Sequence, residues 1–570
     1  MRSKFFLFLI MGGVPLLAQV GATGVPLPEI NPPAMGSSND APLFPTPAYF
    51  RKHFSTPPAR VELRPPLRLD DFVVGDRLEL SLRSFLELVM ANNTDIEIQR
   101  VSMETFQNAI QRAFGPFDPR LVATFQSQRT KTQTGDVLAG AATLSELSQP
   151  VRFTYTQTLD TGTQFNVGFN ASKRSTNNTF ANFNPLLNAQ FGMDFVQPLL
   201  RNRGRYMNRM NVTIARSRLR QGEYNLEDEV LRLIVQAENA YWQVVLDREN
   251  LDVQEKALEV NEQFLKRNER ELELGAISPL DIYQPQARFQ QFKIQVTQAQ
   301  YRLEQSIDAL RRQIGVDMDP RFRKMPIVLT ETVEPPLTTG VIDAENAVEK
   351  ALRFRQDLKA TVQGLDINDL QIKQSNNQLL PDLALTGSYT STGRGGIFYD
   401  RTDVFTEAGA ASQIVQVIPG GFGDAMSQVF GFGYPIYSFG LRLTLPIRDR
   451  AASANLADAM VNKRLTALRA RSLEQQIRQE VLNAVSQVES SKASVDLSKV
   501  QLQLAQQTLD AENKKYELGT NTIFFVLDAQ QQLVQARSQL VQQTVQYRRN
   551  LLNLLQRTGE LLDERGIAVR

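Results

Sequence analysis

The side chains that most often carry out chemistry are scarce in this sequence. It contains no Cys and a single His, His53. The lack of Cys excludes disulfides, thiolate metal sites, a Cys nucleophile and a lipidated N-terminal Cys. A Ser-His-Asp triad would need His53, which lies on a Pro-rich, extended arm that is poorly suited to hold one in place. Asp and Glu are scattered rather than clustered, so we expect no enzyme, no metal site and no cofactor.

The first residues predict an exported protein. A positively charged start, an apolar run and small residues up to Ala22 are typical of a secretory signal peptide over residues 1–22. Residues 23–80 then form a Pro-rich periplasmic arm. No later segment has the roughly 20 apolar residues of a membrane-spanning helix, so membrane insertion would need β-strands. A net charge of +2 gives no sign of a nucleic-acid partner.

The sequence that follows contains an internal repeat. Residues 81–124 align without a gap on residues 343–386, at a shift of 262 positions, and Pro119 falls on Pro381. Each copy reads as one helix that starts at a capping Ser or Asp and ends before a Pro and a strand.

The later part of each half repeats at a shift of 244 positions. The tripeptide Glu-Leu-Gly ends at Gly275 and again at Gly519, and Gly315 matches Gly559, so the glycines of each pair are 40 positions apart. We expect three parts after the arm: a first repeat (81–320), a linker (321–342) and a second repeat (343–570).

Long helices are predicted between these landmarks. Residues 447–518 contain neither Pro nor Gly, and residues 199–274 contain no Pro. The 72 residues of 447–518 would span roughly 110 Å as a helix. A compact globular domain cannot hold such a rod.

Apolar residues recur every seven positions along both rods. This spacing predicts left-handed supercoiling against a neighbouring helix, and an ordinary two-helix coiled coil would show the same pattern. Small residues three positions after the first four seam residues of the second rod would allow close approach. The seam residues are Val244, Leu251, Leu258, Leu265 and Leu272 in the first half, and Val481, Val488, Val495, Leu502 and Leu509 in the second; the small residues are Ala484, Ser491, Ser498 and Ala505.

Each rod is predicted to end in a tight reversal. Gly275 ends the first, and Ser278 is a candidate N-cap that restarts the chain with Pro at the first helical position. Gly519 ends the second, and Asn521 or Thr522 can cap the return helix, which runs to about residue 558. The result is two helical hairpins per chain, with tips at residues 275–281 and 519–525.

Strand patterns occur only where the helices break. Apolar and polar residues alternate with a period of two, which suits a sheet between lipid and a wet lumen, although a soluble sandwich looks similar. One chain has too few strands to close a pore, so several subunits would share one barrel. Whether the hairpin at 151–171 enlarges that barrel or protrudes stays open. The predicted strands lie near 119–129, 151–159, 163–171, 190–197, 383–391 and 437–447.

Several fragments together resemble the TolC-like outer-membrane efflux protein family, over about residues 80–560. The resemblance implies a mainly α fold with membrane β structure: repeated helical hairpins that form a trimeric α-barrel in the periplasm, topped by a shared 12-strand transmembrane β-barrel in the outer membrane. The fragments are Asn92-Asn93-Thr94-Asp95-Ile96, Leu380-Pro381-Asp382-Leu383, Val196-Gln197-Pro198-Leu199, Thr444-Leu445-Pro446-Ile447, Glu238-Asn239-Ala240-Tyr241-Trp242, and the two tips over 274–281 and 516–529.

The resemblance also implies a function and partners. Such channels export cargo for efflux or type I secretion systems, and they work with an inner-membrane transporter and a periplasmic adaptor that docks on the tips and opens them. Asp281 and Tyr516 would link neighbouring coils in the closed state, and Asp528 would form a pore-facing ring of carboxylates that favours cations. The docking residues would be Gly275, Ala276, Ile277, Ser278, Gly519, Thr520, Asn521 and Thr522.

This sequence departs from the family pattern beside the second tip. Phe525 stands where a second acid is common, and Asn521 where a basic residue is common. Our hypothesis is a closed tip that depends less on ion pairs and more on an apolar ring of Phe525. The structural alternatives are that Phe525 only packs between helices and that Asp281 is only an acid near a helix start.

The alternative function is a periplasmic coiled-coil adaptor or scaffold without a barrel. Such a protein is expected to have one hairpin and soluble strands, whereas this chain has two equivalent hairpins and amphipathic strand groups.

Overall fold

A computed structural model describes residues 67–135, 141–275, 277–333, 342–401 and 414–567. The predicted signal peptide and most of the predicted arm lie outside these residues. Within the described ranges, no helix is both long and apolar enough to cross a membrane.

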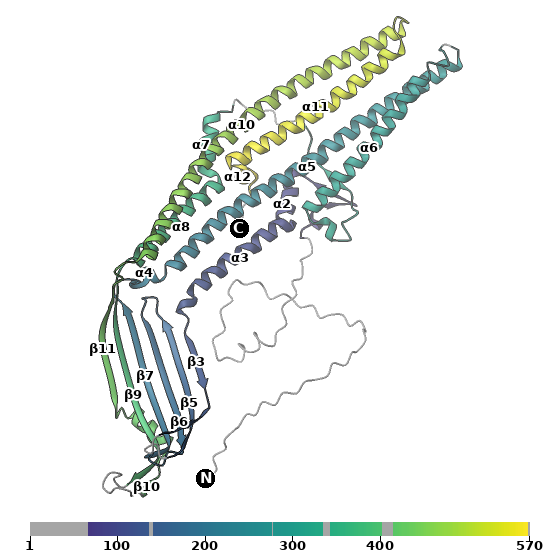
Figure 1. Cartoon of the computed structure of the whole chain (residues 1–570). Helices are drawn as coiled ribbons and strands as arrows, with labels where there is room; N and C mark the ends of the chain where they lie inside the picture. Colours follow the sequence, from purple (N-terminus) through teal and green to yellow (C-terminus); the bar gives the residue numbers. More distant parts are fainter. Residues whose placement is uncertain (1–66, 136–140, 276, 334–341, 402–413, 568–570) are drawn as a thin grey trace, which may run out of the picture. The chain divides into compact units, whose positions relative to one another are not determined.

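Four long helices form two antiparallel hairpins, which Figure 1 shows running side by side. In the first repeat α5 (Met210–Glu273) pairs with α6 (Tyr283–Gln313), and in the second α10 (Arg450–Glu517) pairs with α11 (Ile523–Thr558). The 68 residues of α10 span about 100 Å. The predicted rods and both hairpins are therefore confirmed, with later starts; a short helix, α4 (Gly204–Asn208), precedes α5.

The predicted seam is buried along α10. Val481, Val488 and Val495 are at most 3% exposed, and the small residues Ala484 and Ser491 are 2% and 6% exposed. Small side chains at these positions let α11 approach closely, as the spacing predicts.

The helix before the strands is broken in both repeats, so the prediction of one helix per copy is wrong. It is split into α2 (Leu82–Asn92) and α3 (Thr94–Phe114), and again into α7 (Ala344–Phe354) and α8 (Gln356–Gln378). The single residues at the breaks, Asn93 and Arg355, have extended backbones. The Asn93 side chain caps α3 by accepting from two backbone amides. Arg355 instead forms ion pairs with Asp357 and Glu480, both at 2.6 Å.

Eight of the described strands form the main sheet, and all their pairings are antiparallel. All six predicted strand regions are confirmed, and most strands are longer than predicted. The order across the sheet is β3, β5, β6, β7, β9, β11, while β4 extends β3 along β5 and β10 extends β11 along β9. The strands are β3 (Arg120–Phe125), β4 (Gln128–Gln133), β5 (Thr143–Thr158), β6 (Gln164–Thr176), β7 (Phe183–Pro198), β9 (Asp382–Arg401), β10 (Ile414–Ile418) and β11 (Pro435–Thr444).

A short helix that the sequence did not reveal packs on this sheet. In α9 (Phe422–Phe430), Ala425 and Val429 are buried against Ala189 of β7. Gly393 of β9 makes the contact possible, because a Cβ there would lie 2.0 Å from the Ala425 carbonyl oxygen.

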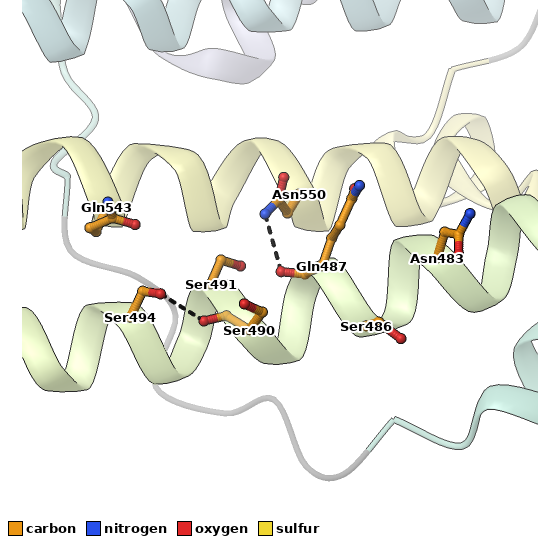
Figure 2. Close-up of a pocket in the computed structure, with 8 residues that line it drawn as sticks. All are labelled: Asn483, Ser486, Gln487, Ser490, Ser491, Ser494, Gln543 and Asn550. Carbon is orange, nitrogen blue, oxygen red and sulfur yellow. Dashed lines mark hydrogen bonds between the residues drawn. The ribbon is translucent and has the colours of Figure 1, made fainter.

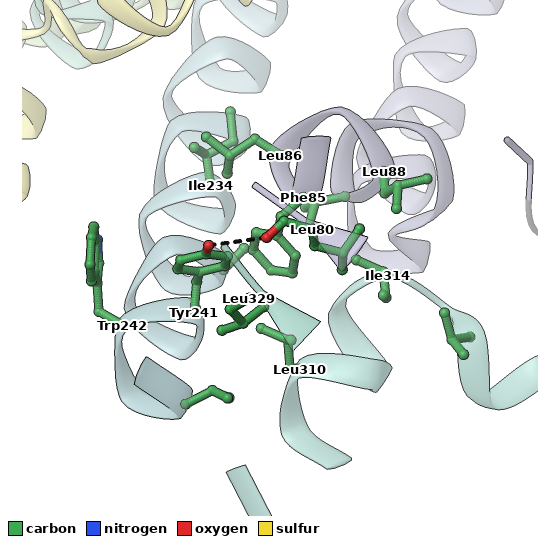
Figure 3. Packing of buried hydrophobic residues seen from close by; sticks show 14 of the residues in the cluster. Leu80, Phe85, Leu86, Leu88, Ile234, Tyr241, Trp242, Leu310, Ile314 and Leu329 are labelled. Carbon is green, nitrogen blue, oxygen red and sulfur yellow. Dashed lines mark hydrogen bonds between the residues drawn. The ribbon is translucent and has the colours of Figure 1, made fainter. Parts of the chain in front are cut away.

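The largest core lies where α2, α5, α6 and the end of α11 meet (Figure 3). It also holds a three-stranded sheet of β1 (Val73–Val74), β2 (Arg77–Leu80) and β8 (Ile327–Leu329). The Phe85 and Tyr241 rings are 5.4 Å apart, and the Tyr241 hydroxyl donates to the Leu80 carbonyl at 3.2 Å. The end of the expected Pro-rich arm is therefore not extended: it folds into this core, because Leu69, Leu78 and Leu80 are at most 2% exposed.

The C-terminal helix α12 (Leu561–Arg565) ties the second repeat to the first. Arg565 pairs at 2.8 Å with Glu238 of α5, whose side chain is 1% exposed. Burial raises the pKa of Glu238, while Arg565 and a hydrogen bond from Trp242 oppose the shift. Trp242 is buried and carries the Arg548 guanidinium over its ring at 4.4 Å.

Candidate functional site: the hairpin tips

Both rods end in the same glycine turn. Gly275 and Gly519 have φ angles of 71° and 73°, in the left-handed region that glycine adopts without strain. The Gly275 amide donates to the Leu272 carbonyl and the Gly519 amide to the Tyr516 carbonyl, at 3.0 Å and 2.9 Å. The duplicated Glu-Leu-Gly motif thus specifies two equivalent helix ends.

The restart of the first hairpin differs from the prediction. The helix α6 begins at Tyr283, and Ser278 closes a turn in which its hydroxyl accepts from the Leu280 amide at 3.3 Å. Pro285 explains the late start. In a helix begun at Pro279 it would be an interior residue without an amide to donate, whereas in α6 it lies in the first turn, where no such bond is needed. Ile277 is half-buried and Ser278 is exposed, whereas Ala276 lies outside the described residues.

The second hairpin restarts at Thr522, the N-cap position of α11, but the Thr522 side chain makes no capping hydrogen bond. Asn521 does not cap either; its amide donates to the Glu512 carboxylate. Lys515 also holds Glu512 at 2.6 Å, and these bonds lower the pKa of Glu512. The Thr520 hydroxyl donates to the Lys515 carbonyl at 3.0 Å.

Tyr516 joins the two hairpins close to their tips. Its hydroxyl donates to the Glu271 carboxylate at 3.4 Å, and Arg267 pairs with Glu271 at 3.0 Å. Burial and the charge of Glu271 raise the pKa of Tyr516. Sequence reasoning identified Tyr516 but not Glu271, which accepts its hydrogen bond.

The two acids predicted to act at the tips have different surroundings. Asp281 is exposed, and its backbone amide donates to the Ser278 carbonyl at 3.0 Å. Asp528 is half-buried on α11 and accepts from Gln532, one turn later, at 2.7 Å. Neither arrangement gathers ligands for a metal, and the described residues contain no cluster of His, Cys, Asp or Glu that could hold one.

Large apolar side chains are exposed at both tips. Leu274 and Leu518, at matching positions, are each 78% exposed, and Leu280 is 75% exposed. Phe525 is 47% exposed and packs edge-on against Phe524, which sequence reasoning did not single out. Exposed apolar residues gathered at one place are typical of a surface that contacts another protein.

Polar grooves run along the hairpins away from the tips. One groove of about 810 Å³ lies between α5, α6, α10 and α11, and nine of its seventeen lining residues are Gln. A smaller groove of about 410 Å³ lies between α10 and α11, where Asn550 donates to the Gln487 carbonyl at 3.2 Å (Figure 2). Predominantly polar linings of this kind remain hydrated at little cost, which suits the wall of a water-filled passage.

Comparison with known families settles what these hairpins belong to. The sequence matches the family described as outer membrane efflux protein over residues 85–316 and 347–560. The two matched segments start 262 positions apart and end 244 apart, which are the shifts of the internal repeat. The chain belongs to the outer membrane efflux protein family.

Related proteins agree with this assignment. The chain is 23% identical over 340 residues to outer membrane protein TolC of Salmonella enteritidis, covering 59% of this chain and 63% of TolC. It is 23% identical over 341 residues to outer membrane efflux protein BepC of Brucella suis, covering 59% and 65%. The alignments thus span less than two thirds of these relatives.

Solved structures show the same fold. The CmeC outer membrane channel of Campylobacter jejuni has a TM-score of 0.58 at 16% identity, with 84% of this chain and 85% of CmeC covered. The open-state MtrE outer membrane channel of Neisseria gonorrhoeae has a TM-score of 0.55 at 16% identity, with 84% and 88% covered. The family assignment favours an outer-membrane channel over the adaptor alternative.

Proposed function

We propose that this chain is one subunit of a homotrimeric channel that exports cargo across the outer membrane for a tripartite efflux or type I secretion system. The sheets of three chains close a barrel in outer-membrane lipid, and the hairpins form a tunnel in the periplasm. A periplasmic adaptor, itself joined to an inner-membrane transporter, docks on the tips and opens them.

The observation that carries the proposal is a sheet that one chain leaves open. Among the described strands, β3 pairs only with β5 and β11 only with β9, so each has a free edge. Every residue of β3 and β11 is exposed. Free edges next to exposed apolar side chains such as Phe125 and Phe439 would aggregate in water, whereas closure with sister chains removes both edges.

The tips supply the gate. The Tyr516–Glu271 contact holds the two hairpins of one chain together, and opening would have to separate or shift them. Asp281 would contribute a link to a neighbouring coil, and Asp528 a ring of three carboxylates in the pore. The exposed Leu274 and Leu518 lie beside the proposed docking residues and suit an apolar adaptor surface.

Channel recordings in planar lipid bilayers test the gate. Tyr516→Phe removes the hydroxyl that binds Glu271, so we expect a longer open time than in the wild type. Glu271→Gln should also lengthen the open time. The double variant should add little to either single change, because both changes weaken the same contact. Tyr301→Phe, a matched change at an exposed tyrosine of α6, should leave the current unchanged. If none of the three tip variants has a longer open time than the wild type, the proposed gate is contradicted.

Two further variants test the pore residues. Phe525→Ser should raise single-channel conductance if a ring of Phe525 narrows the closed tip, and unchanged conductance would contradict that ring. Asp528→Asn should reduce the preference for cations. Its control is Asp510→Asn, because Asp510 on α10 also accepts from a Gln one turn away but is not proposed to face the pore. Equal effects of the two Asn variants would contradict a carboxylate ring at Asp528.

A further inference from the structure

Two rows of side chains run unbroken across six strands. Directly paired residues on neighbouring strands point to the same face of a sheet. One row is polar and takes one residue from each strand. The neighbouring residue of each strand belongs to a second, predominantly apolar row, which lies on the opposite face. The polar row is Arg120, Thr156, Asn166, Asp194, Ser388 and Ser438, and the apolar row is Leu121, Tyr155, Val167, Met193, Tyr389 and Tyr437.

The hairpin of β5 and β6 supplies the second and third residues of each row. It pairs internally from Glu146↔Thr176 to Thr158↔Gln164, and β6 pairs with β7 from Gln164↔Val196 to Arg174↔Leu186. On its other side β5 pairs with β3 along all of β3. The hairpin is thus bonded on both sides in the middle of the sheet.

The turn of this hairpin is anchored at the end of the sheet where the helices begin. Asp160 pairs with Arg205 and Arg209 at 3.2 Å and 2.8 Å, and the Gly204 amide donates to the Thr161 carbonyl at 3.2 Å. Gly162 has a φ of 90°, and a Cβ there would lie 2.6 Å from the side-chain nitrogen of Asn208 and 2.8 Å from the backbone oxygen of Asn202. These contacts hold the turn against α4 and the start of α5.

We propose that the β5–β6 hairpin is part of the pore wall, so that three chains close a barrel of eighteen strands rather than twelve. This inference rests on the proposed trimeric channel. The sheet is six strands across in each chain, and three times six is eighteen. The resemblance to known channels implied twelve, which is four per chain.

The inference also assigns lumen-facing residues and a step in pore width. Barrel diameter grows roughly linearly with strand number, so eighteen strands make a barrel roughly 1.5 times as wide as twelve. Among the described strands of this sheet, four connect to helices that run away from it, since β3 and β9 follow α3 and α8 while β7 and β11 lead into α4 and α10. The strand β10 leads only into the short helix α9, which packs on the sheet. The outer pore is therefore wider than the helical tunnel below it. Thr156, Asn166 and Asp194 line it, and the size limit on cargo lies in the tunnel.

Single-cysteine variants can test this wall, because the chain contains no Cys. Asn166→Cys and Val167→Cys place a thiol on opposite faces of β6. The full chain is reconstituted in phospholipid vesicles and treated with a charged, membrane-impermeant thiol reagent. We expect the reagent to modify Asn166→Cys, which it reaches through the lumen. We expect it not to modify Val167→Cys, which faces lipid. Equal modification of both would overturn the inference.

Ser388→Cys and Tyr389→Cys provide a matched control in the same two rows on β9, outside the hairpin. If position 388 reacts and 389 does not, while 166 and 167 react alike, the hairpin is not in the wall although the barrel exists. If 388 and 389 also react alike, the proposed barrel itself fails. Electron cryomicroscopy of the wild-type trimer needs no variant: eighteen strands support the inference and twelve overturn it.

Discussion

In the first repeat the core beside the rod is built from large side chains, with Phe85 fully buried, whereas the matching position of the second repeat, 262 residues later, is Ala347. The first core also receives the three-stranded sheet of β1, β2 and β8, and Leu561 of α12. The rods and glycine turns are alike in both halves. Duplication has thus kept the two equal hairpins, while the largest cluster of buried apolar side chains formed beside the first rod only.

The largest expected effect is on stability. Phe85→Ala should lower the free energy of unfolding by about 3–5 kcal/mol, because it leaves a cavity in a closed core. Val348→Ala, at a 2% exposed position of the second core, should cost roughly 2 kcal/mol for the methyl groups removed. Thermal unfolding of the two variants in detergent measures the difference, and equal losses would contradict an unequal distribution of core between the repeats.

Ion pairs sharpen the same comparison. Arg565→Ala leaves the buried Glu238 without its partner and should cost about 3 kcal/mol near neutral pH. Arg478→Ala removes an exposed pair with Glu345 of the second repeat, at 2.6 Å, and should cost about 0–1 kcal/mol. Thermal unfolding measures both, and a loss at Arg478→Ala as large as at Arg565→Ala would contradict the comparison.

The Arg565→Ala variant should also respond to pH. Burial raises the pKa of Glu238, and loss of Arg565, which lowers it, raises it further. Between the ordinary and the raised value, the folded state binds a proton that the unfolded state lacks, so stability rises as pH falls through that window. We expect the deficit relative to the wild type to shrink at acidic pH. A deficit independent of pH would show that an uncompensated Glu238 charge is not its cause.

The glycine turns should respond equally. Gly275→Ala and Gly519→Ala each force a left-handed φ on a residue with a Cβ, at about 1 kcal/mol per site, and no atom lies within 4 Å of either added Cβ. Hydrogen exchange of the tips should increase by the same factor in both. Gly423→Ala is the control, because Gly423 also has no atom within 4 Å of an added Cβ but has no positive φ. It should leave the rate of hydrogen exchange at the tips unchanged. Unequal responses of the two turns would show that the tips are not equivalent.

The smallest effect concerns the two restarts. Ser278→Ala should cost about 0.5 kcal/mol or less, because its hydroxyl accepts one long, exposed bond from Leu280. Thr522→Ala should cost less still, since its side chain makes no capping bond. Hydrogen exchange at each restart can rank the pair, and the reverse order would mean that the caps are wrongly assigned.

The sequence predicted features that depend on local rules and missed those that depend on contacts. Long runs without Pro predicted the rods, and the repeated Glu-Leu-Gly predicted the turns. The break at Asn93 could have been found from its Asn-Thr-Asp capping pattern, whereas Arg355 breaks its helix with no Gly or Pro to signal it. Glu271 was missed because only tertiary packing brings it to Tyr516, and α9 because its support is the bare backbone of Gly393 on a distant strand.

The central claim is that one chain cannot close its own sheet and needs sister chains to do so. Native mass spectrometry of the full chain, extracted from membranes in detergent, tests this claim most directly. Our account predicts a particle with the mass of three chains that stays associated as detergent is exchanged. A monomer, of at most 64.2 kDa, that stays in solution without detergent would contradict it.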